Sequence, residues 1–146
     1  MEEAVSRSIE NVKNNLGGPF GCVIVRNGGI IASGVNSVVR DTDPTAHAEM
    51  NAVREACQRL QRIDLSDCEV YSSCEPCPMC FSALKWARVE KIFYSNTSKD
   101  AAGIDFSDDD IYNQIIEERQ GCRRIENPRA PEAFRLWKTS SDKVHY

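Results

Sequence analysis

The chain has 146 residues, of which 41% are hydrophobic and 27% are charged, a balance that predicts one soluble globular domain over 1–146 with its own core. The formal net charge of −4 and the lack of a lysine- and arginine-rich run argue against a nucleic-acid partner. The acidic start Met1-Glu2-Glu3 is unlike a signal peptide and no apolar stretch reaches the roughly 20 residues of a membrane helix, so we expect a cytoplasmic protein with no membrane partner.

The first part of the chain predicts a helix followed by a β-hairpin. Apolar residues recur at steps of four and three, the spacing of an amphipathic helix, at Val5, Ile9, Val12 and Leu16. Gly17-Gly18-Pro19 ends this helix. The apolar runs 20–25 and 30–35 are predicted strands. Between them, Asn27-Gly28-Gly29 is a hairpin turn signal, because Asn and Gly tolerate positive φ.

The middle of the chain alternates helices with strands. We predict a helix over about 46–60, a strand over 68–72, a helix from Pro76 or Pro78 to about Ala87, and a strand over 89–94. Helices that connect successive strands usually produce parallel pairing and a layered domain. We therefore expect an α/β fold with helices packed on the sheet.

Beyond Ser95 the chain becomes polar, with an irregular acidic stretch over 101–110 and two further predicted helices, over 110–119 and 132–138. The last helix contains Phe134, Leu136 and Trp137. Such a concentration of large apolar side chains is not typical of a free tail, so we expect this segment to dock on a protein surface.

Zinc-binding side chains occur in two stretches, Thr45-Ala46-His47-Ala48-Glu49 and Cys74-Glu75-Pro76-Cys77-Pro78-Met79-Cys80. His47, Cys77 and Cys80 offer one imidazole and two thiolates, one ligand short of a tetrahedron. An open fourth position distinguishes a catalytic zinc site from a closed structural one. The two cysteines share one helix face near its N-terminus, where the helix dipole favours thiolates. We predict one Zn²⁺ per chain at these three residues.

Glu49 lies two residues after the predicted imidazole ligand and is free to move protons. Zinc lowers the pKa of a bound water to about 7. Glu49 is predicted to take the water proton and to pass it to a ring nitrogen and then to the leaving amine. The combination of His-x-Glu with Pro-Cys-x-x-Cys is the zinc deaminase signature. The sequence therefore predicts a hydrolytic deaminase with Glu49 as its catalytic acid–base.

Cys74 extends the cysteine pair to a Cys-x-x-Cys-x-x-Cys run, which leaves two other kinds of site open. An iron–sulfur site needs a fourth cysteine at close spacing, and none follows Cys80 until Cys122. A closed zinc site with Cys74 as fourth ligand would make the chain a non-catalytic, zinc-stapled binding module. Glu49 would have no role in such a site, so we expect Cys74 to be a packed thiol that does not bind the metal.

Four stretches of the chain match a known family, namely Gly17–Gly21, Asp43–Glu49, Ser73–Cys80 and Lys99–Ala102. On these residues the chain resembles the cytidine deaminase-like superfamily and, within it, the zinc-dependent guanine deaminases, which are close to plant guanosine deaminases. The resemblance implies a three-layer α/β/α fold with a mixed central sheet flanked by helices. It also implies a hydrolase of purine metabolism that converts guanine to xanthine and ammonia.

The resemblance further implies which side chains bind the small purine substrate. Asn36, at the end of a predicted strand, would read an edge of the purine, and Phe20 and Trp86 would flank its flat ring. Asp108 would accept hydrogen bonds from the N–H groups of guanine. In the family two aspartates directly follow the phenylalanine, whereas here a serine intervenes, so Asp109 remains an alternative to Asp108.

The same resemblance implies a homodimer in which the C-terminal segment, about 111–146, is exchanged between subunits. Tyr146 would then close the active site of the partner. A segment that packs on its own subunit is the alternative, and the sequence does not decide between the two.

Two related activities share the zinc motif. A tRNA adenosine deaminase would need a basic surface for RNA, and the acidic charge balance argues against one. A guanosine or cytidine deaminase would need only room for a ribose, which the sequence does not decide.

Overall fold

The computed structural model describes residues 1–116, 127 and 129–139. The elements in chain order are α1 (Glu2–Lys13), β1 (Gly21–Arg26), β2 (Gly29–Val35), α2 (Val38–Asp41), α3 (Ala48–Leu60), β3 (Cys68–Cys74), α4 (Pro78–Trp86), β4 (Lys91–Asn96), α5 (Ser98–Ala102), α6 (Asp109–Ile116) and α7 (Ala130–Thr139). In this part of the chain no helix combines the length and the apolar character needed to cross a membrane.

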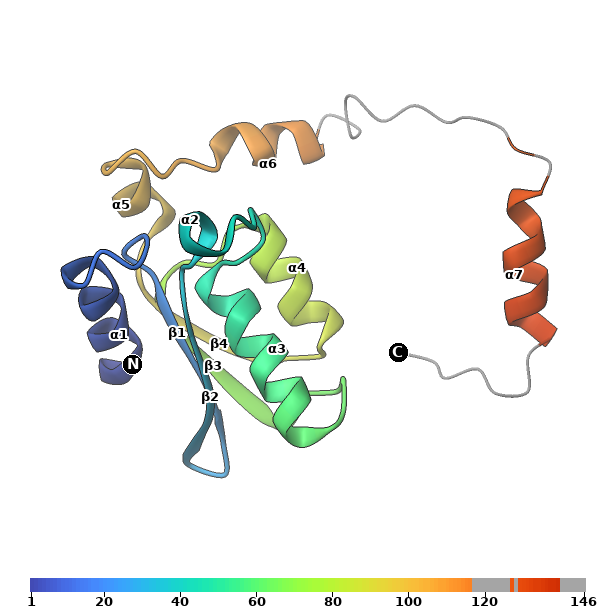
Figure 1. Cartoon of the computed structure of the whole chain (residues 1–146), viewed down its shortest axis with the longest axis horizontal. Helices are drawn as coiled ribbons and strands as arrows, with labels where there is room; N and C mark the ends of the chain where they lie inside the picture. Colours follow the sequence, from blue (N-terminus) through green and yellow to red (C-terminus); the bar gives the residue numbers. More distant parts are fainter. Residues whose placement is uncertain (117–126, 128, 140–146) are drawn as a thin grey trace.

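The sheet is mixed, with strand order β2-β1-β3-β4 (Figure 1). The expected parallel pairing is correct only for β3 and β4, which α4 connects. β1 is antiparallel to both of its neighbours. The hairpin places β2 at the edge, so β3 pairs with β1 and not with β2, although α3 connects β2 to β3.

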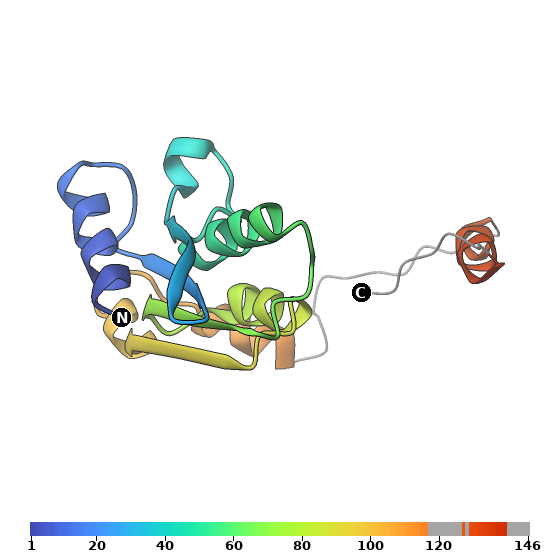
Figure 2. The ribbon, with the colours of Figure 1, turned by 90° about the horizontal axis from the view of Figure 1, so that it is seen from below.

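Helices cover both faces of the sheet, as the predicted three-layer fold requires. α1 lies on one face, and α3 and α4 lie side by side on the other (Figures 1 and 2). The predicted hairpin turn is confirmed, since Asn27 and Gly28 have φ values of 51° and 79°. The chain therefore turns from β1 into β2 within two residues, which keeps the end of β2 close to the start of β1.

The main core lies between the sheet and α3, and small side chains allow the two layers to approach closely. The buried residues of α3 include Ala48, Ala52 and Ala56. Gly34 of β2 faces them, and a Cβ at this position would lie 2.1 Å from the carbonyl oxygen of Ala48. Two non-bonded heavy atoms cannot lie so close. The first turn of α3 can therefore occupy this position only because residue 34 is a glycine.

The helix predicted from the first apolar stripe is confirmed, but its apolar stripe is not the face that packs on the sheet. The buried residues of α1 are Ala4, Ser8 and Asn11. Ile9 and Val12 are each 47% exposed. A small face is required here because α1 approaches β1 too closely for larger side chains, and this leaves an apolar stripe uncovered.

The sequence missed the two short helices. α2 falls in the connection after β2, and α5 precedes and enters the stretch predicted to be irregular. A capping box between Thr97 and Asp100 starts α5. α6 and α7 are present as predicted, although α7 runs from 130 to 139 and the predicted end of the earlier helix at 119 lies outside the described residues.

We expect Gly34→Ala to lower the free energy of unfolding by about 1–3 kcal/mol, as overpacking a close contact does. The added methyl group must displace the first turn of α3. Gly29→Ala is the matched control, because a Cβ there meets only the Arg26 carbonyl oxygen, at 3.7 Å. Urea unfolding of both variants tests this. Equal stabilities for the two variants would mean that α3 does not depend on the close approach.

Candidate functional site

The first turns of α3 and α4 bring three metal-binding side chains together. His47 is the N-cap residue of α3, Cys77 is the N-cap residue of α4, and Cys80 lies in the first turn of α4. Their ligand atoms all lie within 4.8 Å of one another. His47 Nδ1 is 3.6 Å from Cys77 Sγ and 3.5 Å from Cys80 Sγ. The predicted set of three is therefore one cluster.

The spacing of this cluster fits a tetrahedral zinc ion. With Zn–S near 2.3 Å and Zn–N near 2.0–2.1 Å, tetrahedral geometry puts sulfur and nitrogen about 3.5 Å apart. The thiol of Cys80 donates to Cys77, which lowers the pKa of Cys77 to about 4 and raises the pKa of Cys80. Both cysteines become thiolates only when a cation offsets their mutual repulsion, so this donor set suits a divalent metal.

Glu49 lies in the first turn of α3 and is almost fully buried beside the metal ligands. Its Oε1 accepts a hydrogen bond of 2.7 Å from the hydroxyl of Ser72, which is on β3. Burial raises the pKa of Glu49 above the usual value for a carboxyl group. A carboxyl group with a raised pKa binds and releases protons closer to neutral pH, as proton transfer requires.

A pocket with a volume of about 310 Å³ opens directly over this cluster. His47, Glu49 and Cys77 form part of its lining. Most of its lining surface is apolar, with Phe20 and Phe106 in edge-to-face contact at 5.1 Å between ring centroids. An apolar pocket with a few convergent polar groups is typical of a small-molecule site.

Asn36 also lines the pocket, and Asn11 holds it in place. The Nδ2 of Asn11 donates to the carbonyl oxygens of Asn36 and Gly18, at 2.8 Å in each case. Asn11 is buried, so the two bonds join the loop before β1 to the end of β2. This loop also carries Phe20, so the two predicted substrate contacts are fixed relative to each other.

Of the two candidate aspartates, Asp108 lines the pocket and Asp109 is not among the lining residues. Asp108 precedes α6, and its pKa is raised, mainly by burial. Asp109 begins α6 and is exposed. Of the two, the structure therefore places Asp108 in the lining that also contains His47 and Cys77.

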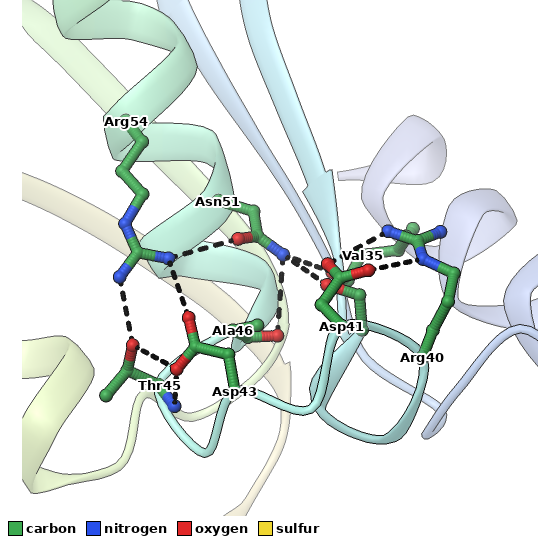
Figure 3. Close-up of polar contacts among 9 residues, drawn as sticks. Val35, Arg40, Asp41, Asp43, Thr45, Ala46, Asn51 and Arg54 are labelled. Carbon is green, nitrogen blue, oxygen red and sulfur yellow. Dashed lines mark hydrogen bonds and ion pairs between the residues drawn. The ribbon is translucent and has the colours of Figure 1, made fainter.

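The loop that joins the end of β2 to His47 is held by side chains of α3 (Figure 3). Asn51 donates to the carbonyl oxygen of Val35 at 3.0 Å and to the hydroxyl of Ser37 at 2.9 Å. Arg54 donates to the hydroxyl of Thr45 at 2.9 Å. One end of this loop carries Asn36 and the other end carries His47, and both residues line the pocket. The network therefore fixes these two residues relative to each other.

One of the predicted substrate contacts, Trp86, does not lie at this pocket, and another cannot be placed. Trp86 is 70% exposed and lines a separate depression with Phe81 and Lys85. It lies six residues after Cys80, which is about 9 Å along a helix, so it reaches the far end of α4. Tyr146 lies outside the described residues.

Cys74 is buried and lines the pocket, but it is not a member of the metal cluster within the described residues. Its Sγ lies 3.6 Å from the carbonyl oxygen of Thr97. This arrangement agrees with the predicted packed thiol and argues against a closed four-ligand site.

The sequence missed several pocket residues. Phe106 gave a local signal, because an aromatic residue in a polar stretch needs a packing partner. Val38 and Val39 of α2, and Ser98 and Ala101 of α5, gave none. These side chains become neighbours only because β2 and β4 run in the same direction, so that their C-terminal ends lie at the same end of the sheet.

Comparison with known proteins agrees with this geometry. Residues 1–96 match the model of the cytidine and deoxycytidylate deaminase zinc-binding region. The chain is 43% identical to a guanine deaminase of Bacillus subtilis, over 100% of this chain and 96% of that protein. It is 48% identical over 86 residues to a tRNA-specific adenosine deaminase of Aquifex aeolicus, covering 59% of this chain and 57% of that protein.

Solved structures also include guanine deaminases that resemble this chain. An X-ray structure of guanine deaminase from Bacillus subtilis superposes with a TM-score of 0.95, covering 99% of this chain and 95% of that one, at 43% identity. A structure of guanine deaminase from Nitrosomonas europaea has a TM-score of 0.69 at 33% identity and covers 73% of this chain and 62% of that one. With its zinc-binding motif, fold and ligand cluster all in agreement, the chain belongs to the cytidine and deoxycytidylate deaminase family of zinc-binding proteins.

Proposed function

We propose that this protein is a zinc-dependent deaminase that hydrolyses guanine to xanthine and ammonia. The observation that carries the proposal is one pocket that joins the metal cluster and Glu49 to Asp108, an acceptor for the N–H groups of guanine. Similarity to the guanine deaminase of Bacillus subtilis supports it, since that similarity extends over the whole chain. Similarity to tRNA-specific adenosine deaminases is less complete, with 48% identity over 59% of the chain for that of Aquifex aeolicus and 30% identity over 81% of the chain for that of Rickettsia typhi.

His47, Cys77 and Cys80 would hold the zinc ion, which supplies a Lewis acid that lowers the pKa of water so that hydroxide exists at neutral pH. Three protein ligands would leave the fourth position of a tetrahedral zinc ion for water. Two helix N-termini point at the cluster, and their partial positive charge stabilises the thiolates. We expect one zinc ion per chain.

Glu49 would move the protons of the reaction. It takes a proton from water and delivers it to a ring nitrogen of guanine as oxygen bonds to the amino-bearing carbon. It would then take the proton of the newly bonded hydroxyl group and pass it to the amino group, so that the C–N bond breaks, ammonia leaves and the hydroxyl oxygen becomes the carbonyl oxygen of xanthine. One water is consumed, and xanthine and ammonia are the products.

Asn36, Phe20 and Asp108 would position the base in the pocket. Phe20 offers an aromatic surface, and the amide of Asn36 can donate and accept along one purine edge. Asp108 accepts from guanine's N–H groups. Adenine lacks those donors at the matching edge, and an unsatisfied buried carboxylate costs roughly 1–3 kcal/mol.

We predict that Glu49→Gln and Cys80→Ser separate proton transfer from metal binding. Glu49→Gln should retain zinc by elemental analysis and lose turnover by about 10²-fold or more, the usual contribution of an acid–base residue. Cys80→Ser should lose zinc and turnover together. Full zinc content in Cys80→Ser would refute the ligand assignment, and near-normal turnover in Glu49→Gln would make the glutamate structural.

We predict that guanine is the preferred substrate in a panel of guanine, guanosine, adenine, adenosine, cytosine and cytidine scored by ammonia release. Asp108→Asn should lower kcat/KM for guanine about 10-fold or more, the equivalent of one unsatisfied hydrogen bond. Asp109→Asn is the matched control and should stay near wild type. Faster release from guanosine would identify a nucleoside deaminase, and faster release from adenosine would favour the tRNA-type activity.

We also propose that the protein is a homodimer in which the segment from about 111 to 146 is exchanged. Residues 1–110 and the described part of this segment each expose apolar side chains. Phe134, Leu136 and Trp137 of α7 are 81%, 64% and 47% exposed, and α7 lies well apart from the sheet (Figure 1). Similarity to the Bacillus subtilis structure includes this part of the chain, since it covers 99% of the residues.

A surface that could receive α7 from a second copy lies beside α1. Tyr71 and Phe93 stack at 4.9 Å between ring centroids. Tyr71 pairs with Val23 on the face of the sheet opposite α3. α1 lies on the same face and exposes Ile9 and Val12. Strand β4 is an edge strand of the described sheet. An apolar face along an edge strand is typical of a surface that another chain covers.

We predict that the protein is a dimer by light scattering and that deletion of 144–146 lowers turnover while leaving the dimer and its thermal unfolding unchanged. The deletion removes Tyr146, the predicted lid over the partner's site, whose loss would admit water. Phe93→Lys should instead shift the protein towards monomer. A monomeric wild type, or a fully active truncation, would contradict the exchange.

A further inference from the structure

Ser72 places a hydroxyl group directly under the proposed acid–base residue. It lies on β3, has no exposed surface, and its Oγ donates to Glu49 Oε1 at 2.7 Å. Its nearest neighbours across the sheet are Cys22 on β1 and Tyr94 on β4. In this buried setting a hydroxyl needs an acceptor, and an ionised carboxylate can only accept. The direction of the hydrogen bond is therefore fixed by chemistry.

We propose that Ser72 is a positioning residue for Glu49, and this inference rests on the proposed deaminase function. By holding Oε1, Ser72 sets the rotation of the carboxylate and leaves Oε2 for the exchange of protons with water and substrate. A general base must lie within about 2.6–3.2 Å of the group whose proton it takes. Small errors in such geometry reduce rates by as much as about 100-fold.

The position of Ser72 separates its effect on the rate from any effect on binding. Ser72 does not line the pocket, whereas Glu49 does. Loss of its hydroxyl should therefore change turnover and leave contacts with the purine intact. The metal ligands lie on the helices and not on β3, so zinc binding should also be unaffected.

Ser73, the next residue, provides a matched control. It is also buried, and its hydroxyl accepts a hydrogen bond of 2.9 Å from the backbone N–H of Gly21. Successive side chains of a strand face opposite sides of a sheet, so Ser73 points away from Glu49. Ser73→Ala thus removes a buried hydroxyl of the same size from the same strand without removing a contact to Glu49.

The test compares Ser72→Ala, Ser72→Thr, Ser72→Val and Ser73→Ala with wild type, using the zinc-loaded full chain and guanine. Thr and Val have nearly the same shape, and only Thr has the hydroxyl. We expect kcat to fall about 10-fold or more in Ser72→Ala and Ser72→Val, and to stay within about 3-fold of wild type in Ser72→Thr and Ser73→Ala. KM should stay within about 2-fold throughout.

Two measurements independent of activity accompany the kinetics. Zinc content should remain one per chain, and the dissociation constant of the product xanthine, measured by calorimetry, should be unchanged in every variant. If thermal unfolding shows that Ser72→Val is not folded, the comparison of Ala, Ser and Thr at position 72 tests the inference. kcat should then be low for Ala and close to wild type for Thr. Turnover that does not follow the hydroxyl, or a loss shared equally by Ser73→Ala, would overturn the inference. An inactive zinc-loaded wild type would instead refute the proposed function.

Discussion

The site depends on two helix N-termini that meet at one end of the sheet, where the strands β2 and β3 end. α3 begins directly after His47, and α4 begins directly after Cys77, so each helix presents its unpaired N–H groups and positive dipole to the same point. Negatively charged sulfur is stable there in a way that it would not be elsewhere in the core. Gly34 sets the height of α3 above the sheet, and β3 and β4 set the position of α4, so the metal cluster is a product of packing between layers.

Around this point, the polar groups of the pocket are held by residues that do not bind the substrate themselves. Asn11 fixes Asn36, Asn51 fixes the end of β2, and Ser72 fixes Glu49. Each of these three is buried or partly buried and uses its side chain for hydrogen bonds that the backbone alone cannot make. Buried polar networks of this kind cost stability when broken and keep the site in one geometry. Hydrogen bonds from α1, α3 and β3 therefore hold the polar side of the pocket in place.

The apolar stripe of α1 shows how surface and core are divided in this protein. The face that packs on β1 is small and partly polar, because the helix lies against Gly21 at a distance that excludes larger side chains. The larger apolar residues of α1, Ile9 and Val12, are left exposed on the face of the sheet that also carries Tyr71 and Phe93. A helix pattern identifies an apolar face, but it does not say whether the same chain or another copy covers it.

From short motifs, the sequence predicted the cluster of His47, Cys77 and Cys80, the hairpin turn and most helices and strands, and it proposed Glu49 as the acid–base residue. Cys77 and Cys80 are one helical turn apart in any α-helix, and Asn27-Gly28 turns a chain in any hairpin, so these features need no knowledge of the rest of the molecule. The tertiary structure alone decided that β1 is antiparallel to β3, that Asp108 and not Asp109 lines the pocket, that Trp86 lies away from it, and that Ser72 reaches Glu49. Each of these depends on strand order, register or helix position between segments far apart in the chain, and no periodicity within a single segment encodes such distances.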